Sequence, residues 1–235
     1  MIQAFERKEK VVLLHGLLGS TYAMKKLERS LSKEGYAVTR IGYPSRTFRI
    51  EKLSEIVRQR ITSISKSTRK VHIVAHSMGG IIVRYIQQYN PLENLSRVVM
   101  LSPPNNGSEI VDKLGHYRLL KWVYGPAFSQ LGTSKKGWIR NTLGAVDFEL
   151  GIITGDRNIN VISSIIMPGK HDGRVSVASA RVQGMKDFRI APANHHFIIN
   201  NKVALKETIA FLRSGSFETP QHNGTHSMGL PLNGN

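Results

Sequence analysis

The stretch "VHIVAHSMGG", residues 71–80, runs from a mostly apolar segment into a serine flanked by small residues. A short apolar run of this kind is typical of a strand in a parallel sheet that is covered on both faces. Ser77 comes at the end of the predicted strand, and a helix is predicted over 80–89. A turn this sharp crowds the backbone two residues before and after the serine, which explains Ala75 and Gly79. The pattern predicts a serine hydroxyl that is held clear of the sheet, close to a helix N-terminus.

The tetrapeptide "HSMG" occurs a second time, at 226–229, within a segment that has almost no apolar periodicity and many turn formers. Neither a strand nor a helix is predicted around this copy. We therefore expect the chemistry at Ser77 and not at Ser227, and we expect residues 214–235 to form a flexible tail.

Outward from Ser77, short β-branched runs alternate with helical patterns. Strands are predicted at 11–16, 36–44, 70–76, 97–103, 150–155 and 187–193, and apolar residues recur at helical spacing over 20–34, 51–65 and 200–213. This alternation predicts a doubly wound α/β domain with a mostly parallel sheet of about six strands, spanning residues 1–213. The alternation breaks over 104–149, which we expect to form a cap-like insert of irregular helices over one end of the sheet.

The chain is strongly basic, with 33 Lys and Arg residues against 16 Asp and Glu residues, a formal net charge of +17. Such a charge favours anionic partners, although a basic surface without a specific partner is the simpler interpretation. The basic residues are spread along the chain and no nucleic-acid-binding motif accompanies them, so no specific nucleic-acid partner is expected.

The insert contains a basic segment, residues 113–140, that has six cations and no Asp or Glu. Its aromatic residues Tyr117, Trp122 and Trp138 lie between Lys113, Arg118, Lys121, Lys135, Lys136 and Arg140. One hypothesis is peripheral docking on an anionic membrane, with the aromatic edges at the headgroups. The alternative is a basic cap that packs its aromatic residues inward.

No apolar run is long enough to span a bilayer, and no apolar segment follows the charged start "MIQAFERKEK". The absence of cysteine fits a reducing compartment, so a cytoplasmic location is expected. The adjacent pair His195 and His196 has no carboxylate or third histidine at ligand spacing, and we expect neither a metal nor a cofactor.

A serine that carries out acyl transfer also needs hydrogen-bond donors for an oxyanion, a base and an orienting acid. The segment "HGLLGS", residues 15–20, follows the first clear strand and could direct the backbone N–H of Leu17 toward Ser77. The N–H of Met78, directly after the serine, would be the second donor. The alternatives are an ordinary turn or a phosphate-binding loop, but the motifs of a P-loop and of a dinucleotide fold are absent.

Together, "HGLLGS", "AHSMGG" (75–80), "HDGRVSVASA" (171–180) and "NHHFI" (194–198) resemble the α/β-hydrolase superfamily, in particular its small bacterial lipase- and esterase-like members. The segments "VVMLSPPNNGS" (98–108) and "VDFELGIITGDRNIN" (146–160) extend the resemblance to nearly all of 10–213. It implies a serine hydrolase with a catalytic triad and no cofactor. Ala75 replaces the usual first glycine of the serine turn, a substitution that small bacterial lipases share.

In this family the acid follows the nucleophile in the chain and the histidine comes last. Asp172 lies in the glycine-flanked loop where the family carries its acid, and Asp156, directly after the preceding strand, is the rival. Neighbouring side chains point in different directions, so only one of His195 and His196 can reach Ser77. Related hydrolases place their histidine two residues before an aromatic–aliphatic pair, and this alignment selects His195.

The leading hypothesis is a serine hydrolase that cleaves carboxylic esters of lipid or acyl type through an acyl-enzyme. An acyltransferase or thioesterase would use the same residues with a different acceptor or substrate. From another class, a non-catalytic module could use the basic surface to bind membranes or nucleic acid. All three triad residue types occur in the expected order, which favours the enzyme.

Overall fold

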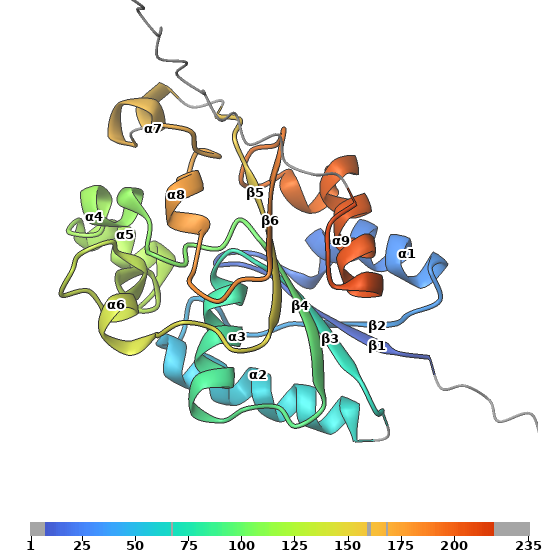
Figure 1. The fold of residues 1–235 in the computed structure, drawn as a ribbon. Coiled ribbons are helices and arrows are strands. Elements are labelled where there is room, and N and C mark those ends of the chain that lie inside the picture. The colour runs from blue at the N-terminus through green and yellow to red at the C-terminus, as the bar shows by residue number, and fades with distance from the viewer. Residues whose placement is uncertain (1–7, 67, 159–160, 168, 219–235) are drawn as a thin grey trace, which may run out of the picture.

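Six parallel strands form one sheet in the part of the chain that the computed structural model describes, residues 8–66, 68–158, 161–167 and 169–218 (Figure 1). The strand order is β2-β1-β3-β4-β5-β6, and every neighbouring pair is parallel. The strands are β1 (Lys10–Leu14), β2 (Ala37–Ile41), β3 (Val71–His76), β4 (Leu95–Leu101), β5 (Glu149–Gly155) and β6 (Asp187–Ala191). The predicted doubly wound α/β sheet is confirmed, as are all six predicted strands, to within a few residues at their ends.

Helices cover both faces of the sheet (Figure 1). One face packs against α1 (Lys25–Lys33) and α9 (Lys202–Ser214), and the other against α2 (Ile50–Ser65) and α3 (Met78–Tyr89). Successive side chains of β1 alternate between these layers, since Val11 and Leu13 join the first cluster while Val12 and Leu14 join the second. All four are fully buried, and each contributes about 1.5–3 kcal/mol of transfer free energy.

The chain reverses its direction across the sheet at β1, because β2 lies on one side of β1 and β3 on the other. In open α/β sheets such a switch point leaves a crevice outside the carboxyl ends of the two strands. The segment that follows β1 begins at His15, and the residue that follows β3 is Ser77. The topology therefore brings the "HGLLGS" segment and the serine to the same crevice.

The insert consists of short helices, in agreement with the sequence prediction. These are α4 (Glu109–Leu114), α5 (Arg118–Tyr124), η2 (Phe128–Leu131) and α6 (Trp138–Thr142). Phe128 is buried, and the Trp138 indole donates a hydrogen bond to Glu51 of α2 at 2.8 Å. Among the described residues, three other short helices were not expected, because each is too brief to show periodicity: α7 (Val161–Ile166), α8 (Val177–Ala180) and η3 (Ile198–Asn200). The short helix η1 (Thr21–Met24) precedes α1 within the segment 20–34, where a helix was predicted.

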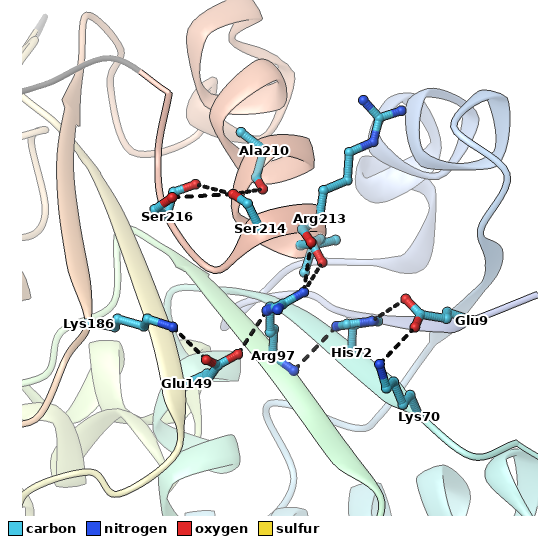
Figure 2. Close-up of polar contacts among 11 residues, drawn as sticks. Glu9, Lys70, His72, Arg97, Glu149, Lys186, Ala210, Arg213, Ser214 and Ser216 are labelled. Atoms are coloured by element: carbon cyan, nitrogen blue, oxygen red, sulfur yellow. Dashed lines mark hydrogen bonds and ion pairs between the residues drawn. The ribbon is translucent and has the colours of Figure 1, made fainter.

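A row of polar side chains links the strands near their amino ends (Figure 2). His72 of β3 is fully buried and accepts a hydrogen bond from the Arg97 N–H at Nδ1, so its Nε2–H donates to Glu9 at 3.0 Å. Arg97 of β4 pairs with Glu149 at 2.8 Å and donates to the carbonyls of Leu212 and Arg213 at the end of α9. His72 is thus the satisfied core residue that its position within a strand predicts, and Arg97 stabilises the end of α9.

The chain after α9 folds back on the domain as far as the structure describes it. The Phe217 ring packs against Phe211 with centroids 5.2 Å apart, and the Phe217 N–H donates to Asp187. The first residues of the predicted flexible tail therefore have packing partners. Residues 219–235, including the second "HSMG" copy, lie outside the described residues.

Candidate active site

Ser77 occupies a sharp turn between β3 and α3. Its backbone has φ 52° and ψ −125°, a left-handed conformation that residues other than glycine rarely adopt. The Ser77 N–H donates to the Leu101 carbonyl of β4 at 2.8 Å, which fixes the turn to the sheet. A Cβ at Gly79 would lie 2.9 Å from the His15 carbonyl oxygen, so only glycine fits there. The strained turn holds the Ser77 hydroxyl above the carboxyl edge of the sheet.

A chain of hydrogen bonds joins Ser77, His195 and Asp172. His195 Nε2 lies 3.0 Å from Ser77 Oγ, and His195 Nδ1 lies 2.8 Å from Asp172 Oδ2. Because a carboxylate only accepts, Nδ1 carries the proton and Nε2 accepts from the serine hydroxyl. The His195 N–H also donates to the Asp172 carbonyl at 2.9 Å. This tautomer leaves Nε2 free to take the hydroxyl proton.

Asp172 is almost fully buried yet held in its ionised form. Burial alone would raise the pKa of its carboxyl, but the neighbouring His195, the Ser102 side chain and the Val175 N–H together hold that pKa below its usual value. Its Oδ1 accepts from the N–H groups of Arg174 and Val175 at 2.9 and 2.8 Å. The carboxylate can therefore orient His195 and stabilise a positive charge on its ring.

Among the described residues, neither rival joins this chain of hydrogen bonds. Asp156 pairs with the adjacent Arg157 at 3.5 Å, and none of its contacts among the described residues reaches His195. The His196 ring stands edge-on to that of His195, with centroids 5.9 Å apart, and is exposed. Burial of part of the ring lowers the pKa of His196, and the charge of Arg174 lowers it further. Asp172 and His195, the two residues selected from the sequence, are the ones that form the chain of hydrogen bonds with Ser77.

The "HGLLGS" segment lies against the serine. A Cβ at Gly16 would come within 2.9 Å of the Ser77 Cβ, so the backbone on either side of Gly16 passes close to the hydroxyl. Leu17 lines the same cavity as Ser77, and Met78 is the first residue of α3. In the described part of the chain, neither the Leu17 nor the Met78 N–H donates to a protein acceptor. Both remain available to an oxygen atom bound beside Ser77.

Tyr43, after β2, fixes the start of this segment and was not identified from the sequence. Its hydroxyl donates to the His15 carbonyl, and its ring stacks on the His15 ring with centroids 4.2 Å apart. His15 Nδ1–H donates to the Gly16 carbonyl at 2.8 Å, so Nε2 is the acceptor for the Tyr43 N–H. Burial lowers the pKa of His15, which keeps this neutral tautomer. Tyr43 and His15 together hold the peptide that precedes the predicted donor at Leu17.

His76 and Ser102 are two further buried residues whose roles the sequence analysis missed. His76 Nε2–H donates to the His195 carbonyl at 2.8 Å, which joins the serine turn to the histidine loop. Ser102, directly after β4, has φ 49° and is fully buried beside Asp172, whose pKa it helps to lower. The position of each at the carboxyl end of a predicted strand was the available signal.

The burial of the His76 ring leads us to expect that the folded protein loses stability in acid. Burial, with a smaller effect of the neighbouring His195 ring, lowers the pKa of His76 from 6.5 to about 3. The unfolded chain therefore binds a proton that the folded chain excludes, and the free energy of unfolding falls as the pH drops from about 6.5 to about 3. A His76→Gln variant keeps an N–H donor and cannot titrate. Denaturant titrations should show the two stabilities diverging by up to about 1.4 kcal/mol per pH unit in this window. Parallel stability curves would contradict the assignment.

A cavity of about 310 Å³ opens beside Ser77 and His195. It is bounded by the "HGLLGS" segment, by α4 and η2 of the insert, and by the loops after β5 and β6. Its walls are mostly apolar, with Leu17, Met24, Val111, Phe128, Leu131 and Ile199 among them. Such walls suit an aliphatic chain. Among the described residues, no group of three or more His, Asp or Glu side chains could hold a metal ion.

Residues 11–157, more than half of the chain, match the model of the alpha/beta hydrolase family. No curated protein matches the sequence significantly. The mature form of a lipase from Bacillus licheniformis is 20% identical, with a TM-score of 0.68 over 88% of this chain and 91% of that one.

Two other solved structures share the fold over less of their own length. A metagenomic carboxyl esterase is 17% identical, with a TM-score of 0.63 over 80% of this chain and 65% of that one. A phospholipase from Legionella pneumophila is 20% identical, with a TM-score of 0.62 over 74% of this chain and 44% of that one. At these identities the likeness concerns the fold.

Proposed function

Because this chain belongs to the alpha/beta hydrolase family, we propose that it is a serine hydrolase that cleaves carboxylic esters of lipid or acyl type. Ser77 is the nucleophile, His195 the base and Asp172 the residue that orients it. The observation that carries the proposal is the hydrogen-bonded chain from Asp172 Oδ2 through the His195 ring to Ser77 Oγ, with distances of 2.8 and 3.0 Å. The ester bond as target is inferred from the apolar cavity and from the lipases and esterases that share the fold.

In the first half of the reaction, Ser77 Oγ attacks the carbonyl carbon of the ester while its proton moves to His195 Nε2. The carbonyl oxygen gains negative charge and accepts hydrogen bonds from the N–H groups of Leu17 and Met78. Asp172 stabilises the positive ring that results. When the intermediate collapses, the carbon–oxygen bond to the alcohol breaks and His195 gives its proton to the departing oxygen.

In the second half, a water molecule replaces the alcohol. His195 takes a proton from the water, whose oxygen attacks the acyl-enzyme carbonyl, and the bond to Ser77 Oγ then breaks. The same proton returns to Ser77, which releases the carboxylic acid. An acyltransferase would place a second alcohol where this water attacks, and a thioesterase would release a thiol in the first half.

Activity on a panel of acyl esters of graded chain length, with the matching thioesters and amides, tests the proposal. The wild-type protein should hydrolyse esters, and a Ser77→Ala variant should not. A preference for thioesters, or acyl transfer to an added alcohol in place of hydrolysis, would favour the alternatives on the same residues. Absence of activity on the whole panel would favour a non-catalytic module.

The cytoplasmic location expected from the sequence stays a prediction.

We also propose that α5 contacts an anionic membrane. In this helix no residue is buried, and Leu119 and Trp122 have exposed fractions of 69% and 76%, with Tyr117 just before it at 54%. None of the six cations of 113–140 forms an ion pair with a described residue. The helix lies between α4 and η2 in the chain, and both of these line the cavity. Within the described residues, no helix is long and apolar enough to cross a bilayer.

Vesicle binding tests this contact, and the different environments of the two tryptophans allow it to be followed by fluorescence. Trp122 is exposed, whereas Trp138 packs against Tyr85 and donates to Glu51. A Trp138→Phe variant leaves Trp122 as the only tryptophan, and its emission, excited selectively over that of tyrosine, should shift to shorter wavelength on vesicles of anionic lipid. Binding should grow with the anionic fraction and fade with salt. Equal binding to neutral vesicles, or no shift at all, would show that α5 does not dock in this way.

A further inference from the structure

Arg174 stands out among the described residues that line the cavity beside Ser77, because it alone carries a permanent charge. The other lining residues are apolar, uncharged or histidine. Asp172 lies two residues away in the chain, but its oxygens already accept from Arg174, Val175 and His195.

The backbone of Arg174 is fixed at both of its polar groups. Its N–H donates to Asp172 Oδ1 at 2.9 Å, and its carbonyl accepts from the Ser108 hydroxyl at 2.6 Å. In the described part of the chain, no carboxylate oxygen lies within 4.0 Å of its guanidinium nitrogens. The backbone of Arg174 is therefore fixed beside the cavity, and its guanidinium has no counter-ion among the described residues.

The surroundings of Arg174 indicate which part of an ester it would meet. His195 Nε2 must lie beside the departing alcohol oxygen, because it donates the proton to that atom. Arg174 and His195 contact the same carboxylate, because Asp172 Oδ1 accepts from the Arg174 N–H and Oδ2 from the His195 ring, and both residues line the cavity together with His196. Arg174 thus lies on the side of His195 and His196, where the alcohol leaves.

We propose that Arg174 binds an anionic group on the alcohol part of the ester, an inference that rests on the proposed function. The preferred substrates are then acyl esters of small alcohols that carry a phosphate or a carboxylate. A guanidinium fork matches either group, since both offer two oxygens in one plane. The acyl chain takes the apolar part of the cavity.

Kinetics on matched butanoyl esters test the inference. The first pair is butanoylglycerol, which is neutral, and butanoylglycerol 3-phosphate, which is anionic. The second pair is the O-butanoyl derivative of methyl glycolate, which is neutral, and the O-butanoyl derivative of glycolate, which is anionic. The wild-type protein should prefer the anionic member of at least one pair, and the pair that responds distinguishes phosphate from carboxylate. Arg174→Gln should lower kcat/KM for that substrate roughly 10- to 100-fold, the range for hydrogen bonds to charged groups. The loss should fall mainly on KM, because Arg174 does not touch the reacting atoms.

Two further variants separate binding from other effects. Arg174→Lys should restore part of the preference, since the charge stays and the fork is lost. Lys170→Gln removes the same charge from an exposed residue of the same loop and should leave both substrates unchanged. Equal wild-type rates within both pairs, or equal losses on neutral and anionic esters in Arg174→Gln, would overturn the inference while ester hydrolysis stands. No hydrolysis of any ester would overturn the proposed function, and this inference with it.

Discussion

A Ser77→Ala variant is expected to lose ester hydrolysis almost completely, with kcat lower by roughly 10⁴- to 10⁶-fold. The reason is that the base and the orienting acid have no function without a nucleophile to activate. The fold should remain, because only the Oγ is removed and the turn is fixed by the Ser77 N–H bond to Leu101. Circular dichroism and a denaturant titration check the fold, and steady-state kinetics on a butanoyl ester measure the loss.

Ser227→Ala is the matched control, since it changes the serine of the second "HSMG" copy. We expect wild-type kinetics from it. A folded Ser77→Ala protein that keeps more than a few per cent of the activity would show that another residue attacks the ester. A large loss in Ser227→Ala would show that the tail takes part in the reaction.

His195→Ala is expected to produce a loss of similar size, and His196→Ala a small one. His195 Nε2 lies 3.0 Å from Ser77 Oγ and its Nδ1 is bonded to Asp172, whereas His196 is exposed and makes neither contact. The double variant Ser77→Ala/His195→Ala should be barely worse than either single variant, because residues that act as a unit lose their effect together. Each protein is checked for folding and then for kcat and KM.

The adjacent pair provides its own control. A modest loss at 195 with a collapse of kcat at 196 would transfer the role of the base one residue along. Modest losses at both would remove the base from this loop.

The fold could be predicted from the sequence because its signals are local. The six strands are short β-branched runs, and α2 and α9 have apolar residues at helical spacing. The pattern that predicts each of these elements is therefore contained within 5 to 16 residues. The short helices α7 and α8 span about one or two turns, too few to show a period. The insert could be recognised as irregular for the same reason.

The candidate site could be predicted only in part. Ser77 has a local signal in its strand–turn–helix context, and Asp172 and His195 were selected by resemblance. The supporting contacts have no local signal, since His76 meets the His195 carbonyl across 119 residues of sequence and Tyr43 meets His15 across 28. In the sequence, Arg174 does not differ from the other cations of a basic chain. The structure shows that it lines the cavity and that no described carboxylate lies within 4.0 Å of its guanidinium nitrogens.

The location of a covalent phosphonate label tests the central claim most directly, because it depends on the nucleophile and base but not on the choice of ester. Wild-type protein is treated with a fluorophosphonate, digested and analysed by mass spectrometry, alongside His195→Ala and His196→Ala. The account predicts one adduct, on Ser77, that is nearly absent from His195→Ala and retained in His196→Ala. An adduct on another residue, or equal labelling of Ser77 in all three proteins, would contradict it.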